Sequence, residues 1–305
     1  MVLTSIALLV LGVLLAEPVS RALAAAEWPS RDPTGALLLW QAVGLAGGLA
    51  LLGAGVTFGL APLGDSLPAA LVALAGHLAR REWPAALGPV QLAALAATLV
   101  LAARLQGVLG LATVRTLRAR RRHRDLLDVL ATPWPAMAGA QVLAHPLPAA
   151  YCLPGLRSAR LVVTEGALAA LSPAELAAVL AHERAHLRER HDLVVLPFVA
   201  WGATAPWVPG MARAQLAVAA LVEMRADDVA RASVGESALA GALRGVSDGA
   251  RLPGRAGLTS FTAAAAGRLD RLDRCPPRPS WRMRALPRLA ALALIGLPTA
   301  ALLLT

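Results

Sequence analysis

Four apolar stretches dominate the pattern of hydrophobic and polar positions along the chain. About 20 apolar residues cross the hydrocarbon core of a bilayer, and we therefore predict a membrane-spanning helix in each stretch. The predicted spans are Val2 to about Ala16, which can continue past Pro18, Gly35 to about Leu63, about Leu87 to Thr113, and a shorter one from Leu289 to Leu304. Residues 1–5 carry no basic side chain, which favours a retained first span with its N-terminus outside over a cleaved signal peptide.

Composition supports a membrane protein. Hydrophobic residues make up 57% of the 305 residues and charged residues only 16%, whereas a soluble domain carries about 25% charged residues. The two cysteines, Cys152 and Cys275, are far apart and fit neither a metal-binding spacing nor a disulfide framework. We therefore expect two free thiols in a reducing compartment.

The basic residues, which are all arginines, predict the orientation in the membrane. Six of them lie between Arg115 and Arg124, directly after the third span, and Arg278, Arg282, Arg284 and Arg288 precede the fourth. Cytoplasmic flanks of spans collect such residues, so we expect residues 115–284 on the cytoplasmic side. Arg80 and Arg81 would lie outside and count against this orientation. Despite the net charge of +10 we expect no nucleic-acid partner, because anionic lipid is the nearer partner for a cluster beside a span.

The expected domains are a three-helix transmembrane region (1–113), a cytoplasmic catalytic domain (114–284) and a C-terminal transmembrane helix (285–305). Short strands are predicted at Gln141–Leu143, Ala149–Leu153 and Ala159–Val163, between proline and glycine breaks. Ser172-Pro-Ala-Glu175 has the pattern of a capping box and predicts a helix to about Arg190. A second helix is predicted from about Met211 to Ser233.

The first of these helices carries the sequence His182-Glu183-Arg184-Ala185-His186. Histidines at positions i and i+4 share one helix face, so both imidazoles can reach one metal ion. Zinc takes two imidazoles and a third protein ligand and keeps a position for water, which Glu183 could deprotonate. The alternative is two solvated surface histidines. Apolar neighbours such as Val179 and Leu180 argue against it, because they predict a buried helix face.

Glu223 is the best candidate for the third ligand, and Asp227, one helical turn on, could orient a ligand histidine. A solvated charged helix end is the alternative interpretation of these acidic residues. The apolar run 194–222 lies between His186 and Glu223 and cannot cross the membrane once, because that would separate the ligands. We expect either a hairpin that crosses twice or a fold-back at the membrane surface, with a break favoured by Pro197, Pro206 and Pro209.

These elements resemble two groups of membrane gluzincins, the BlaR/MecR antibiotic-sensing transducers and the CAAX prenyl proteases with their bacterial heat-shock relatives. The matching segments are AAYCLPG (149–155), the segment 161–192 with HExxH, and EMRADD (223–228). Three spans before the peptidase domain and one after it favour the BlaR/MecR group. The fold class that this implies is an α-helical membrane protein of about four transmembrane helices with a cytoplasmic α+β gluzincin-like zinc peptidase domain that carries a small β-sheet.

Residue by residue, the resemblance implies one Zn²⁺ per chain held by His182, His186 and Glu223, with Glu183 as catalytic base and Asp227 as a supporting residue. It also implies that a substrate strand adds to the strand formed by Leu161, Val162, Val163 and Thr164. The chain departs from the family pattern at His191, where an aspartate is common, and we expect His191 to be structural or exposed rather than a ligand. No penicillin-binding domain follows the last span, so sensing of a β-lactam by this chain is not expected.

The leading hypothesis is a multi-pass zinc endopeptidase of the cell membrane that acts on a cytoplasmic or membrane-proximal protein or peptide, including a transcriptional repressor in a signalling pathway. Quality-control or prenyl-type proteolysis is an alternative within the same chemistry. A non-proteolytic zinc-binding receptor or scaffold is an alternative of another class, although it has no use for Glu183. Arg225 could stabilise an oxyanion, but a salt bridge with Asp228 is the preferred interpretation. His77 and His123 are expected to be exposed polar residues.

Overall fold

A computed structural model describes residues 1–155, 159–250, 265–274 and 280–304, so that Cys275 and Arg278 lie outside the described residues. The N-terminal part contains α1 (Val2–Leu14), a π-helix (Leu15–Val19), α2 (Ser20–Ala25), short 3₁₀ turns (Trp28–Ser30 and Ala61–Leu63), α3 (Pro33–Leu60), α4 (Leu67–Ala79) and α5 (Pro89–Leu130). The remainder contains β1 (Ala131–Pro133), β2 (Ala140–Leu143), β3 (Ala150–Leu153), β4 (Arg160–Thr164), α6 (Glu165–Ala170), α7 (Pro173–Arg188), α8 (His191–Thr204), α9 (Pro209–Val234), α10 (Glu236–Ala250), α11 (Ala265–Asp273) and α12 (Trp281–Leu304).

Four helical segments among the described residues are long and apolar enough to cross a membrane, at Val2–Ala25, Pro33–Leu63, Pro89–Leu130 and Trp281–Leu303. This agrees with the four predicted spans. The first continues past Pro18 because the π-helix accommodates the missing backbone N–H of the proline. The expected domain boundaries at 113/114 and 284/285 both fall inside unbroken helices, α5 and α12. Helix α4 was not predicted.

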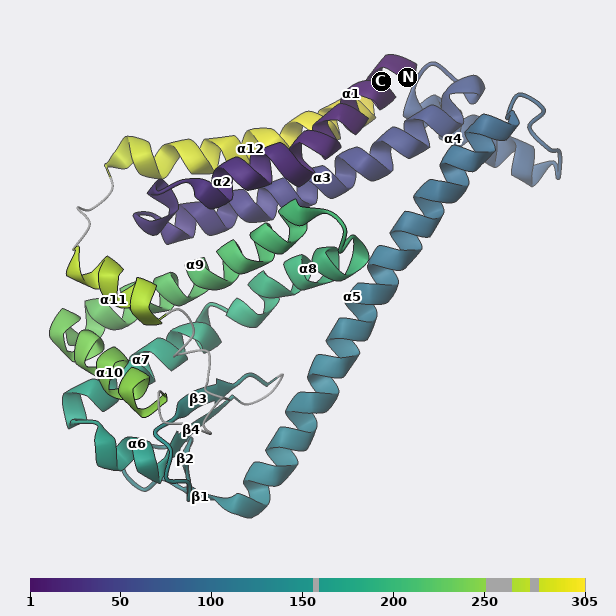
Figure 1. Cartoon of the computed structure of the whole chain (residues 1–305). Coiled ribbons are helices and arrows are strands. Elements are labelled where there is room, and N and C mark those ends of the chain that lie inside the picture. The colour runs from purple at the N-terminus through teal and green to yellow at the C-terminus, as the bar shows by residue number, and fades with distance from the viewer. Residues whose placement is uncertain (156–158, 251–264, 275–279, 305) are drawn as a thin grey trace.

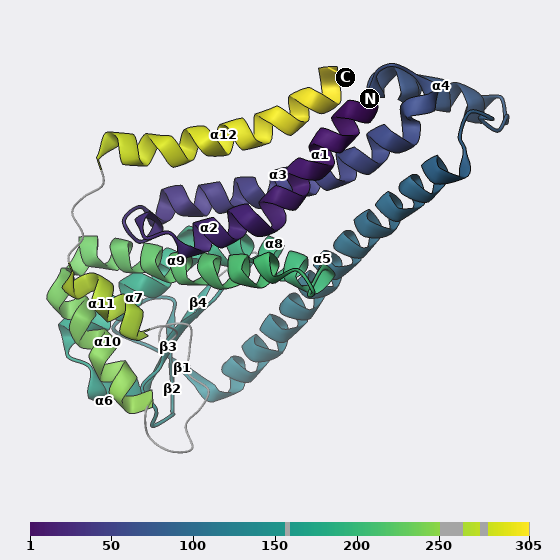
Figure 2. The ribbon, with the colours of Figure 1, turned by 45° about the horizontal axis from the view of Figure 1, so that its top comes forward.

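Helices α1–α3 and α12 lie on one side of the molecule and the sheet lies on the other (Figures 1 and 2). Helices α1–α2, α3 and α12 lie side by side, and α5 leans away from them until it reaches the sheet (Figures 1 and 2). Both chain termini and α4 lie at one end, whereas β1–β4, α6, α7 and α10 lie at the other (Figure 1). Close packing along α3 relies on small buried residues such as Ala46, Ala50 and Ala54, as is common between membrane helices.

The four-stranded sheet has the order β1-β2-β4-β3, with β2 and β4 parallel and the other pairs antiparallel. The three predicted strands are confirmed to within one residue. Strand β1 was missed because Thr132-Pro-Trp-Pro was interpreted only as a break. A proline is tolerated there since β1 is an edge strand. Strand β4 is central, and Val162 and Val163 are completely buried.

Helices α8 and α9 form the hairpin that lies between the metal-binding segments. The chain turns at 205–208, next to Pro206 and Pro209, whereas Pro197 is accommodated inside α8. The hairpin is attached to the apolar helices at three levels. The side chain of Gln41 donates to the carbonyl of Val194 (2.7 Å), that of Arg104 donates to the carbonyl of Thr204 (2.9 Å), and the backbone N–H of Gly210 donates to the carboxylate of Glu17 (2.6 Å). Residues 194–222 therefore do not form one straight helix that would separate His186 from Glu223.

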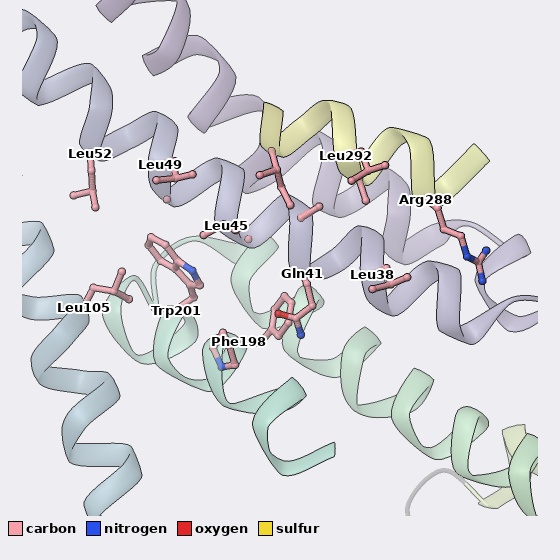
Figure 3. Close-up of a pocket in the computed structure, with 16 residues that line it drawn as sticks. Leu38, Gln41, Leu45, Leu49, Leu52, Leu105, Phe198, Trp201, Arg288 and Leu292 are labelled. Carbon is pink, nitrogen blue, oxygen red and sulfur yellow. The ribbon is translucent and has the colours of Figure 1, made fainter. Parts of the chain in front are cut away.

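An apolar cavity of about 630 Å³ lies between α3, α8 and α12, with Leu105 of α5 at one end (Figure 3). Its walls are leucines of α3 and α12 together with Phe198 and Trp201 of α8. Trp40 of α3 meets Phe198 edge to face, with ring centroids 6.3 Å apart. Helix α8 is therefore packed directly on a predicted span.

Candidate metal and catalytic site

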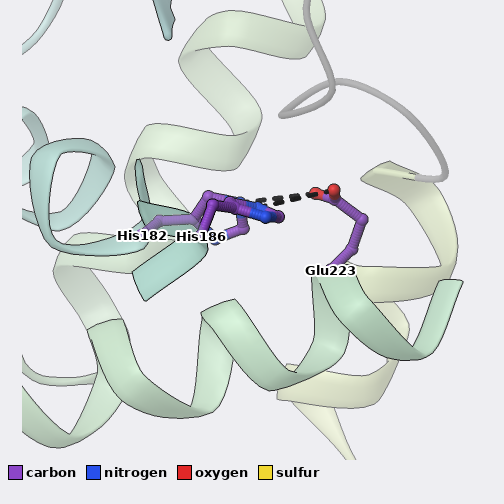
Figure 4. Close-up of side chains that lie close together, drawn as sticks. All are labelled: His182, His186 and Glu223. Atoms are coloured by element: carbon purple, nitrogen blue, oxygen red, sulfur yellow. Dashed lines mark hydrogen bonds and ion pairs between the residues drawn. The ribbon is translucent and has the colours of Figure 1, made fainter. Parts of the chain in front are cut away.

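The candidate metal ligands come from two helices. His182 and His186 project from α7, whose start is fixed by the predicted capping box of Ser172 and Glu175. Glu223 projects from α9 toward both imidazoles (Figure 4). The Nε2 atoms of the two histidines are 3.0 Å apart, and the Glu223 carboxylate oxygens lie 3.3 Å from Nε2 of His182 and 3.5 Å from Nε2 of His186. The structure thus brings together all three residues that the sequence suggested.

This donor set fits a zinc ion. Ligand atoms that each lie about 2.1 Å from a tetrahedral zinc ion are about 3.4 Å apart, close to the spacing observed here. Oε2 of Glu223 and Oε1 of Glu183 are buried and make no hydrogen bond within the described residues. Burial first, and the positive fields of His182 and His191 next, lower the pKa of His186 to about 2, so its imidazole is neutral, as metal binding requires.

Each ligand histidine is held through its other ring nitrogen. Nδ1 of His182 lies 3.0 Å from Oδ1 of Asp227, and Nδ1 of His186 lies 2.9 Å from Nδ1 of His191. Such partners fix the orientation of the ring and the nitrogen that faces the metal. Burial alone would lower the pKa of His182, but the neighbouring carboxylates of Asp227 and Glu223 raise it overall. His191 was expected to be either structural or exposed. It is buried, which agrees with a structural residue and rules out an exposed one.

Glu183 lies beside the ligands and is almost completely buried. Its Oε2 accepts a hydrogen bond from the backbone N–H of Cys152 on β3 at 3.0 Å. Burial raises the pKa of Glu183, although His182 and the Cys152 N–H oppose the shift. A carboxylate in this environment accepts a proton more readily than an exposed one, as a general base must.

The predicted substrate strand needs a correction. Leu161, Val162, Val163 and Thr164 form β4, which pairs with β2 on one side and with β3 on the other. Both backbone edges of β4 are therefore occupied, and a substrate strand cannot add to it. Strand β3 is the edge strand next to α7, and the N–H of its Cys152 points toward Glu183 rather than to β4. The sequence could not distinguish the two, because a central strand and its edge neighbour are both short and apolar.

Sequence reasoning also missed four polar contacts. Arg225 forms a bidentate pair with Glu189, at 2.9 and 2.7 Å, and not the predicted bridge with Asp228. Asp228 instead pairs with Arg271, and Arg268 reaches the metal site. The segment GRLDRLDR around these arginines alternates in charge like a solvated helix, but the i,i+3 spacing of Leu269 and Leu272 could have indicated a buried face. His123 was expected to be exposed, but it is half-buried and contacts the hydroxyl of Tyr151 at 2.9 Å.

The comparison with protein families gives a match to Peptidase family M48 over residues 115–246. The matched segment begins in the basic half of α5 and contains the sheet, α7, the α8–α9 hairpin and Glu223. Neither curated proteins nor solved structures gave a match. This part of the chain is therefore similar to metallopeptidases, whereas α1 to α4, α11 and α12 lie outside the matched segment.

Proposed function

We propose that the protein is a membrane-bound zinc endopeptidase. The observation that carries the proposal is the convergence of His182, His186 and Glu223 on one point, with the buried carboxylate of Glu183 beside it. The match to Peptidase family M48 supports the same conclusion. A receptor or scaffold that only binds zinc would not need a buried base next to the ligands.

The roles of the residues follow from their positions. His182, His186 and Glu223 would hold the ion, which when bound supplies Lewis-acid chemistry and an acidified water. Glu183 would take the proton of the attacking water and deliver it to the leaving amine. Asp227 and His191 would keep the two imidazoles oriented. The backbone N–H of Cys152 restrains one oxygen of Glu183 and leaves the other without a hydrogen-bond partner in the described structure.

The substrate would be a protein or peptide segment in extended conformation along the edge strand β3. Its backbone would then pass next to Glu183, because the outer edge of β3 faces this residue. A folded protein would have to present a loop or terminus there. This replaces β4 as the proposed substrate-binding strand.

Cytoplasmic placement of the site remains part of the proposal. The six arginines between Arg115 and Arg124 lie on the half of α5 that approaches the sheet, and both chain termini lie at the opposite end (Figure 1). The positive-inside rule then puts the sheet and the metal ligands in the cytoplasm and the N-terminus outside. The bilayer would surround α1–α3, α12 and the apolar half of α5.

The arrangement of the candidate spans supports a proposal for the biological role. Three candidate spans before the catalytic segment and one after it favour a BlaR/MecR type, with a repressor-type protein as substrate in a signalling pathway. Quality-control or prenyl-type proteolysis is the competing role. Comparison of protein fragments in cells with and without the protein separates the two, since only the first yields a cleaved transcriptional regulator.

The enzymatic proposal is tested with detergent-purified wild type and Glu183→Gln, assayed on casein and on the chain itself. We expect one bound zinc in both forms and cleavage by wild type only, which a chelator abolishes and added zinc restores. Equal cleavage by both forms would contradict the role of Glu183. Absence of bound zinc in the wild type would refute the metal site itself.

A further inference from the structure

Two buried arginines on α11, Arg268 and Arg271, contact α9 in parallel ways. Arg268 is 2% exposed and pairs with Asp227, and Arg271 is 8% exposed and pairs with Asp228. Burial of an arginine is unfavourable unless its charge is paired, so both contacts are specific features of how α11 docks. Arg271 also donates to the carbonyls of Ser30 and Met224, whereas Arg268 reaches the metal ligands.

The guanidinium of Arg268 bridges the two carboxylates that matter most for the site. Its Nε and Nη2 donate to the two carboxylate oxygens of Asp227, at 2.7 and 2.5 Å. Its Nη1 lies 3.3 Å from Oε2 of Glu223, and its Nη2 lies 3.3 Å from Nδ1 of His182. One side chain therefore restrains a metal ligand directly and a second ligand through the aspartate that orients it.

The charges explain why such a bridge is needed. Glu183, Glu223 and Asp227 place three carboxylates within one buried site, and Glu223 and Asp227 lie one turn apart on α9, where like charges repel. A single guanidinium leaves a surplus of two negative charges, which a divalent cation balances. Without Arg268 the carboxylates would be free to separate or to turn away, and the preformed geometry would be lost.

We propose that Arg268 is a positioning residue of the metal site, so that zinc affinity depends on the contacts of this side chain with Asp227 and Glu223. The inference rests on the proposed zinc site. It extends that site to a helix that lies outside the segment matched by the family comparison. The chemical role is to hold the carboxylate of Glu223 and, through Asp227, the imidazole of His182 in the geometry that the ion requires.

The test is the zinc dissociation constant of the full-length chain in detergent, measured by competition with a chromophoric chelator. We expect Arg268→Ala to weaken zinc binding by about 10–100-fold, the usual effect of removing a partner of a metal ligand. Arg268→Lys keeps the charge but not the bidentate geometry, and should recover part of the affinity. Arg271→Ala is the matched control, because it removes the other buried pair on α11 and leaves the ligands untouched.

The outcomes separate the inference from the function on which it rests. Wild-type affinity in Arg268→Ala, or equal losses in Arg268→Ala and Arg271→Ala, would overturn the positioning role and leave the zinc site standing. A wild type that binds no zinc would overturn both. If circular dichroism shows that Arg268→Ala does not fold, Arg268→Lys decides: weaker binding than wild type supports the inference, and unchanged binding refutes it.

Discussion

The contact between α3 and α8 can be tested with two glycines one helical turn apart. A Cβ atom at Gly48 would lie 2.8 Å from Cζ2 of Trp201, closer than non-bonded atoms tolerate. A Cβ atom at Gly44 would lie 3.8 Å from Cε1 of Phe198, an ordinary contact distance. Gly48→Ala must therefore rotate the indole or separate the two helices, whereas Gly44→Ala needs neither.

The magnitude follows from the difference between these variants. Both gain the same helix propensity, so this contribution cancels when they are compared. Overpacking costs about 1–3 kcal/mol. The apolar cavity beside Trp201 gives the ring room to move, so we expect Gly48→Ala to be less stable than Gly44→Ala by about 1–2 kcal/mol, the lower part of that range.

The assay is equilibrium unfolding of the detergent-solubilised chain by sodium dodecyl sulfate, followed by tryptophan fluorescence. Gly107→Ala provides the reference for propensity alone, because no atom lies within 4 Å of the position that its Cβ would occupy. Equal stabilities of Gly44→Ala and Gly48→Ala would refute the close approach of the Trp201 ring to Gly48.

Three further predictions concern the site and its attachment. Burial and the Glu183 carboxylate raise the pKa of the Cys152 thiol. Its alkylation at pH 8 should therefore be at least about tenfold slower than that of a free cysteine, and it should be faster in Glu183→Gln. Peptide mass spectrometry measures both rates. His191→Ala leaves Nδ1 of His186 without its partner and should weaken zinc binding about 10–100-fold by chelator competition. Gly210→Ala would overlap a carbonyl oxygen of the first span and should destabilise the protein by about 1–3 kcal/mol in the unfolding assay; unchanged stability would contradict the close approach.

Local patterns could be predicted from the sequence, and long-range pairings could not. His182 and His186 share a helix face whatever the rest of the chain does, and the capping box that starts their helix is equally local. The spans were recognisable because each contains a long apolar stretch with few charged residues. Glu223 needed support from a resemblance, since nothing in its own surroundings relates it to a helix some 40 residues earlier.

The features that were missed depend on which segments meet in space. Arg268 became part of the site only because α11 docks on α9, and the spacing of Leu269 and Leu272 does not reveal on which helix α11 docks. The error over β4 has the same origin, because the position of a strand within a sheet is decided by its neighbours. His191 stands where the family pattern commonly has an aspartate. It differs from that pattern in residue type, yet it still contacts the imidazole of the ligand His186.

Helix α9 connects the interior of the predicted membrane region to the catalytic centre. Its first turn is held by Glu17, which accepts hydrogen bonds from Gly210 and Arg213, and Glu223 lies in its second half. The distance along the helix from Gly210 to Glu223 is about 20 Å. Because a helix of this length moves as a stiff rod, a tilt or a piston-like shift of the first span would displace a metal ligand without any rearrangement of the sheet. A movement of the first predicted span would therefore be transmitted to the candidate metal ligand Glu223 through one unbroken helix.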